Sequence, residues 1–196
     1  MKRSITSLIL ILATAGILPA HPHVWIDSRV EVQLSGNRIE SVRASWTFDP
    51  MFTEMIVLDH GRGTDGEYSQ AQVERIRRGA FDNLRHYGYF THIEIDGRAI
   101  EVDSVERFNA RLNDENFLEY SFEVPLQVPI DGGSTTLKVS MYDETFFTDI
   151  AYREDYAGVT GAGAVRYRKD FSRERHSIPI WGYMMREAVE FVFEAN

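Results

Sequence analysis

The sequence predicts a mainly β protein of the α+β class: an antiparallel β-sandwich with a helix–loop–helix insertion and a C-terminal helix. Two observations predict the sheets, namely short runs in which apolar and polar residues alternate and turn residues between those runs. Apolar residues repeated at helical spacing in two places predict the helices. The 196 residues are 43% hydrophobic and 26% charged, which suits one domain with a buried core.

The strands follow from period-two patterns along most of the chain. From Val24 to Leu34 every second residue is apolar or small, Ser35-Gly36-Asn37 supplies turn chemistry, and a second alternating run ends at Phe48. Residues 23–48 are therefore predicted to form a β-hairpin. Similar runs predict strands over residues 90–95, 98–102, 107–112, 117–124, 136–142, 146–152 and 164–171.

Between the first strands and the later ones, the sequence predicts two helices around a Gly-rich loop. Pro50 begins a short helix over residues 51–58, and Ser69 caps a longer one that ends at Gly88. The loop around Gly66 resembles a calcium-binding EF-hand. With Gly66 at the sixth position, glycines occupy the first and third positions and Gln72 the twelfth, so we expect a degenerate loop without calcium.

The end of the chain carries a second apolar stripe at helical spacing. We expect a C-terminal helix that packs on the core, with a helix facing a membrane or a partner as the alternative. The residues of the stripe are Trp181, Met184, Met185, Ala188, Val189, Val192 and Phe193.

The first twenty residues have the features of a secretory signal peptide. Lys2 and Arg3 precede an uncharged apolar run from Ile5 to Leu18, and Ala20 is a small residue at the expected cleavage point. We expect residues 1–20 to be removed and residues 21–196 to form a single periplasmic domain. An uncleaved membrane anchor is the alternative, and no later segment resembles a transmembrane span.

Composition narrows the functional classes. The absence of Cys excludes disulfides, Cys-ligated zinc and thiol nucleophiles, and the net charge of −9 argues against nucleic acid as a partner. No Gly-x-Ser-x-Gly elbow, His-Glu-x-x-His sequence or phosphate-binding loop occurs in the chain. We therefore expect a binding protein rather than an enzyme.

Cleavage after Ala20 would create a nitrogen-rich metal site. The mature chain would begin with His21, whose free amine and imidazole chelate one metal ion, and His23 adds a third nitrogen. Pro22 has no N–H, which blocks the square-planar amino-terminal mode. Acidic and imidazole candidates for completing the site are Asp143, Asp149, Asp49 and His60.

Each of these added candidates also has a structural interpretation. Asp143 and Asp149 suit turn and strand-edge positions, and Asp49 suits a cap for the helix that begins at Pro50. A single His in a loop, such as His60, is usually solvated. The sequence leaves both interpretations open.

Several of these segments together resemble one family, long catalogued only as a domain of unknown function and described as an uncharacterised transport-system periplasmic component. The segments are His21-Pro22-His23-Val24-Trp25-Ile26-Asp27, Trp46-Thr47-Phe48-Asp49 with Phe52, Gly88-Tyr89-Phe90, and Tyr142-Asp143-x-Thr145-Phe146-Phe147. The resemblance covers roughly residues 21–170. Its members occur beside NicO-type nickel/cobalt permeases, and some such pairs are associated with zinc acquisition.

The resemblance implies a periplasmic metal-binding protein that delivers a divalent ion to an inner-membrane permease. We expect Zn²⁺, since no Met-rich cluster or Cys accompanies the His pair, with Ni²⁺, Co²⁺ and Cu²⁺ as alternatives. Two other functions remain open: a copper-binding protein or enzyme that uses the His21 chelate, and a metal-free adaptor that binds a transporter through the C-terminal helix.

Overall fold

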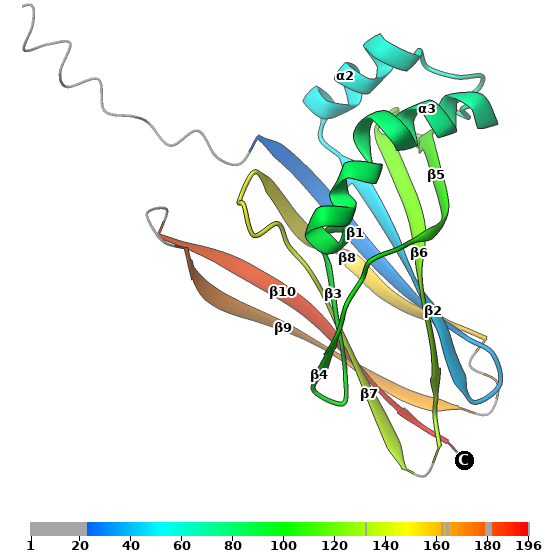
Figure 1. The fold of residues 1–196 in the computed structure, drawn as a ribbon, viewed down its shortest axis with the longest axis vertical. Helices are drawn as coiled ribbons and strands as arrows, with labels where there is room; N and C mark the ends of the chain where they lie inside the picture. The colour runs from blue at the N-terminus through cyan, green and yellow to red at the C-terminus, as the bar shows by residue number, and fades with distance from the viewer. Residues whose placement is uncertain (1–22, 132, 162, 164, 179–181, 196) are drawn as a thin grey trace, which may run out of the picture.

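The computed structural model describes residues 23–131, 133–161, 163, 165–178 and 182–195. The predicted signal peptide and His21 lie outside these residues. The described part of the chain forms ten strands and three helical segments, whose arrangement can be followed in Figure 1. The strands are β1 (Val24–Leu34), β2 (Arg38–Phe48), β3 (Thr91–Ile95), β4 (Arg98–Ile100), β5 (Glu106–Leu112), β6 (Leu118–Pro129), β7 (Ser134–Met141), β8 (Thr148–Thr160), β9 (Arg166–Ile178) and β10 (Gly182–Glu194). The helical segments are α2 (Pro50–His60), α3 (Gln70–Ala80) and the 3₁₀ segment η1 (Asp82–Phe90).

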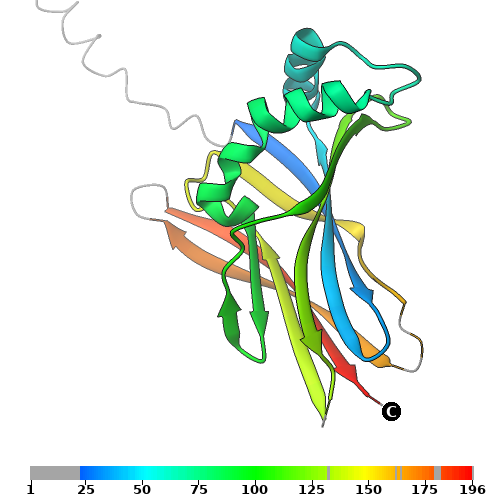
Figure 2. The same ribbon diagram turned by 45° about the vertical axis from the view of Figure 1, so that its right-hand side comes forward.

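The strands form two five-stranded sheets, which confirms the mainly β class. One sheet has the order β5-β6-β2-β1-β8 and the other the order β4-β3-β7-β10-β9. The chain passes from the first sheet through α2, α3 and η1 into the second, and the helical segments cover one end of the molecule (Figure 2). The predicted hairpin over residues 23–48 is present as β1 and β2.

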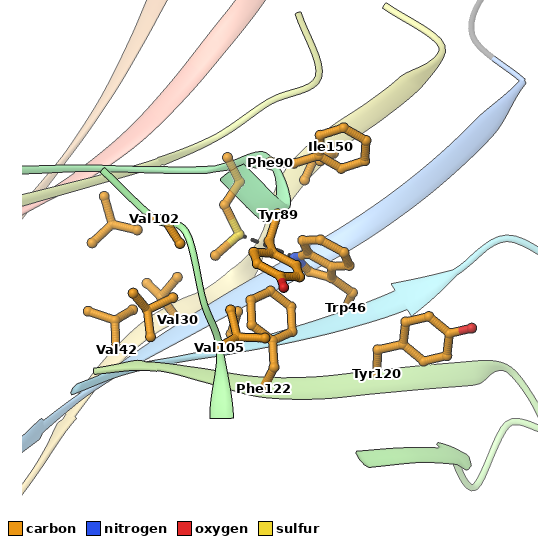
Figure 3. Packing of buried hydrophobic residues seen from close by; sticks show 14 of the residues in the cluster. Val30, Val42, Trp46, Tyr89, Phe90, Val102, Val105, Tyr120, Phe122 and Ile150 are labelled. Atoms are coloured by element: carbon orange, nitrogen blue, oxygen red, sulfur yellow. Dashed lines mark hydrogen bonds between the residues drawn. The ribbon is translucent and has the colours of Figure 1, made fainter. Parts of the chain in front are cut away.

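The hydrophobic core lies between the two sheets and centres on Trp46 of β2. Its indole ring is fully buried. The ring packs against Phe81, Phe90 and Phe122, whose ring centroids lie 6.2, 6.2 and 4.8 Å from its own. The indole Nε1 donates to the Met141 sulfur at 3.3 Å, which joins β2 of one sheet to β7 of the other (Figure 3). Apolar burial and aromatic packing therefore hold the sheets together.

One strand pair departs from the antiparallel prediction. β1 and β8 are parallel, with Trp25 opposite Asp149 and Ile26 opposite Ile150. Two parallel strands need a long connecting segment. Here the segment between β1 and β8 contains most of the chain. The fold therefore mixes both kinds of pairing, and the prediction of a purely antiparallel sheet was wrong.

The predicted C-terminal helix was also wrong, because that segment forms β10. It lies between β7 and β9 and pairs antiparallel with both. Val189, Phe191 and Phe193 belong to the main core, while Ala188 and Val192, which alternate with them, are also buried. A strand buried on both faces loses its period-two pattern, and here the apolar residues fall by coincidence at helical spacing.

The two helices of the insertion are present, but the likeness to an EF-hand is not supported. Ser69 accepts from the Gln72 N–H while the Gln72 side chain accepts from the Ser69 N–H, so Gln72 completes a capping box. Gly66 has φ +82°, and its carbonyl accepts from the Leu112 N–H at 2.8 Å. The loop is thus a turn tied to β5.

The longer predicted helix is shorter than expected. α3 ends at Ala80, and Phe81 leads into η1 instead of continuing the helix to Gly88. Phe81 is fully buried against the aromatic core, which fixes the bend. No helix among the described residues is long and apolar enough to cross a bilayer.

Truncating Phe191 tests the position of β10. Phe191→Ala removes a fully buried ring and should lower the free energy of unfolding by about 3–5 kcal/mol. Glu190→Ala, at the exposed neighbouring position, should change it by no more than about 0.5 kcal/mol. Urea unfolding followed by circular dichroism measures both; equal effects would contradict the two-sheet core.

Candidate functional site at the start of β1

His23 is held at the very start of β1 by the segment that precedes β8. Its backbone N–H donates to the Phe147 carbonyl at 2.8 Å, and the two ring centroids lie 5.0 Å apart. The β1–β8 register places Val24 opposite Thr148 and Trp25 opposite Asp149. The predicted ligand His23 is therefore supported by a strand rather than carried on a free chain end.

His23 and Asp149 lie on the same face of the sheet. Side chains alternate along a strand, and β1 buries Val24 and Ile26 while Trp25 faces outward. Asp149 is the exposed register partner of Trp25. Since Val24 is opposite Thr148, His23 lies two register positions from Asp149 across the β1–β8 ladder. The two predicted ligands are therefore neighbours on the same face of the sheet.

Asp49 serves as the cap of α2. One of its carboxylate oxygens accepts from the backbone N–H groups of Met51 and Phe52 at 2.7 and 3.0 Å. The other accepts from the Trp25 N–H at 2.9 Å. Asp49 therefore fastens the beginning of α2 to β1, which is the structural interpretation that the sequence left open.

Asp143 is buried, with 1% of its surface exposed. One carboxylate oxygen accepts from the backbone N–H and the hydroxyl of Thr145 at 2.8 and 2.7 Å, and the other accepts from the Thr148 N–H at 3.0 Å. These bonds close the loop between β7 and β8 into a compact turn. Asp143 thereby positions Phe147 against His23.

His60 lies apart from the other candidates. It is the last residue of α2, and its carbonyl accepts from the Gln72 side chain at 2.8 Å. The 11 residues of α2 separate it from Asp49 by about 16 Å along the helix. Among the residues that the structure describes, no three His, Asp or Glu side chains gather closely enough to hold a metal ion.

Beside this strand end lies a largely apolar cavity of about 280 Å³, which no pattern in the sequence predicted. Val24 of β1, Phe147 just before β8, and Asp143 all line this cavity. Its remaining wall comes from β2, α2, α3, η1 and β6. No local sequence pattern reports a cavity assembled from so many elements.

Tyr120 lies in the same wall and is almost fully buried. Burial raises the pKa of its phenol well above the usual range, so the group stays protonated under ordinary conditions. Its hydroxyl has no hydrogen-bond partner among the described residues. The interior of this region is therefore poorly supplied with polar partners.

Sequence comparison places the chain among uncharacterised proteins. Residues 6–174 match the family described as "Protein of unknown function (DUF1007)". The chain belongs to this family. The matched span includes β1, the loop around Asp143 and all of β8, so the candidate site lies within the part shared with the family.

Two curated relatives carry no functional description. The DUF1007 chain is 35% identical over 99 residues to an "Uncharacterized 15.5 kDa protein in trpE 3'region" of Spirochaeta aurantia, covering 50% of this chain and 69% of the relative. It is 23% identical over 139 residues to an "Uncharacterized protein" of Haemophilus influenzae, covering 70% of this chain and 65% of the relative.

Among solved structures, the crystal structure of AChBP from Bulinus truncatus matches with a TM-score of 0.35 and 11% identity, covering 97% of each chain. This likeness is too low to support an argument about either fold or function.

Replacing Asp49 tests its role as a cap. Asp49→Ala removes three accepted hydrogen bonds at the junction of β1 and α2, and it should lower the free energy of unfolding by about 1–2 kcal/mol. Asp59→Ala, at the exposed far end of the same helix, should cost less than about 0.5 kcal/mol. Thermal and urea unfolding provide the measurement. If Asp49→Ala left the free energy of unfolding unchanged, Asp49 would not be the cap of α2.

Proposed function

We propose that this protein binds a divalent transition metal at the start of β1 and delivers it to a membrane permease. His23 and Asp149, with His21 two residues upstream of His23, are the proposed ligands, and Zn²⁺ is the proposed ion. The observation that supports this proposal is the register, which places His23, at the start of β1, two positions from the exposed Asp149 on the same face of the sheet.

The chemistry of these side chains supports zinc. Imidazole nitrogens and a carboxylate oxygen are common zinc ligands, and three protein ligands leave one position for water or for a ligand from a partner. The covalent chain keeps the Cα atoms of His21 and His23 within about 7 Å of each other. An incomplete ligand set suits a carrier that must release its ion. Ni²⁺, Co²⁺ and Cu²⁺ remain chemically compatible with the same donors.

The cellular setting is part of the same proposal. The basic and apolar start of the sequence supports export to the periplasm, and a NicO-type inner-membrane permease is the proposed receiver. The excess of acidic side chains, with a net charge of −9, supports a cationic cargo. We assign no enzymatic step to the site.

A metal-free adaptor is the second candidate function, and α2 supplies the observation that favours it. Met51, Met55 and Leu58 are 63, 48 and 83% exposed and fall at i, i+4 and i+7, so they form one apolar face of the helix in solvent. Such a face suits a partner protein. The sequence predicted that an adaptor would dock through a C-terminal helix, but residues 182–194 form the strand β10. The exposed apolar face of α2 is the docking surface proposed in its place.

Zinc titration of protein that begins at His21 tests the metal proposal. We expect a Kd tighter than about 10 µM, equivalent to about 7 kcal/mol. His23→Ala and Asp149→Asn should each weaken binding at least tenfold, since each removes a ligand. Isothermal titration calorimetry measures these affinities, and mass spectrometry verifies the first residue.

Asp27→Asn is the matched control, because Asp27 is exposed on the same face of β1 but lies four residues from His23 and opposite Ala151. Its affinity for zinc should remain unchanged. No binding tighter than the stated limit, or equal losses in all three variants, would overturn the proposal. In that event, loss of partner binding in a Leu58→Glu variant would favour the adaptor.

A further inference from the structure

The cavity beside the start of β1 has walls dominated by aromatic rings. Six of them come from Trp46, Phe48, Phe52, Tyr87, Phe90 and Phe147. Tyr87 and Phe147 are 52 and 48% exposed, so two of the rings reach from the cavity to the surface. The faces of aromatic rings carry partial negative charge, which attracts cations.

Asp143 supplies a full negative charge to the same cavity. The residue is 99% buried and lines the cavity, and its carboxylate accepts three hydrogen bonds from Thr145 and Thr148. A carboxylate offers about four acceptor positions, so one remains for a ligand. In the described part of the chain no Lys, Arg or His forms an ion pair with Asp143.

A buried carboxylate that has hydrogen bonds but no cationic partner lacks a counter-charge. Removing such a charge from water is costly, and a bound cation offsets that cost. The surrounding rings favour a cation with an apolar body over a hydrated metal ion, because they cannot replace water ligands. Asp143 is also the one His, Asp or Glu residue in the described lining, which is too few for a metal site.

We propose that this cavity binds a small organic ammonium ion, with the ammonium group at Asp143 and the apolar body against the aromatic rings. The volume of about 280 Å³ sets the size of the ligand. A cavity of about 150 Å³ holds one benzene ring, so this one accommodates a single ring with a short aminoalkyl chain. This site is separate from the proposed zinc ligands and does not depend on them.

Two molecules of nearly equal shape test the charge requirement. 2-Phenylethylamine is an ammonium ion at neutral pH, whereas 2-phenylethanol is uncharged. Titration of metal-free protein in the presence of a chelator should show at least tenfold tighter binding of the amine. Tryptophan fluorescence should change during the titration because Trp46 lines the cavity. Calorimetry provides an independent measure of affinity.

Variants of the protein test the location. Asp143→Asn should reduce the affinity for the amine to that for the alcohol, because the charge is lost while the amide oxygen can still accept the two hydrogen bonds from Thr145. Ala80→Leu fills the cavity from the end of α3 without touching the loop, and it should weaken both ligands at least tenfold. Asp27→Asn, on the outer face of β1, should leave both affinities unchanged. Circular dichroism establishes that each variant is folded.

Equal affinity for amine and alcohol would overturn the role of Asp143, and no binding of the amine at about 1 mM would overturn the site. Unchanged binding in a folded Ala80→Leu protein would place the ligand elsewhere and overturn the proposal, even if Asp143→Asn failed to fold. The chelator separates these outcomes from zinc binding, so either proposal can fail without the other.

Discussion

The parallel pairing of β1 with β8 is the constraint on which the candidate site depends. It brings the start of the described chain beside residues that lie more than 120 positions later, and it fixes Trp25 opposite Asp149. The backbone bond from His23 to Phe147 extends the same ladder to the first described residue. Without this pairing, the predicted ligands on the two strands would have no fixed relation to each other.

The parallel pair in turn requires the chain to cross from one sheet to the other between β7 and β8. Asp143 makes that crossing compact, because its buried carboxylate accepts from Thr145 and Thr148 on the far side of the turn. Hydrogen bonds to a charged group are stronger than neutral ones, about 1.5–3 kcal/mol each. The same turn presents Phe147 both to His23 and to the aromatic cavity. The two proposed sites thus share one support.

Much of the local structure could be predicted from the sequence. The alternation in β1 and β2, the Ser69 cap and the Pro50 helix start all report interactions between residues close in the chain. The prediction of a helix at β10 was wrong for a physical reason. Ala188 and Val192 are buried on one face of the strand, and Val189 and Phe193 are buried on the other. Such a strand has apolar residues at consecutive and four-apart positions, which a helix shows as well.

The candidate site could be predicted only in part, because the role of a carboxylate depends on which donors surround it. Asp49, Asp143 and Asp149 are equivalent in a list of acidic residues near aromatic ones. The fold gives Asp49 the N–H groups of a helix start and Asp143 those of a tight turn, while Asp149 stands exposed on the outer face of β8. A carboxylate already bound by N–H donors is a poorer metal ligand than an exposed one. The tertiary structure decides which N–H groups surround each carboxylate. It therefore favours Asp149 as the proposed zinc ligand and Asp143 as the proposed partner of an organic cation.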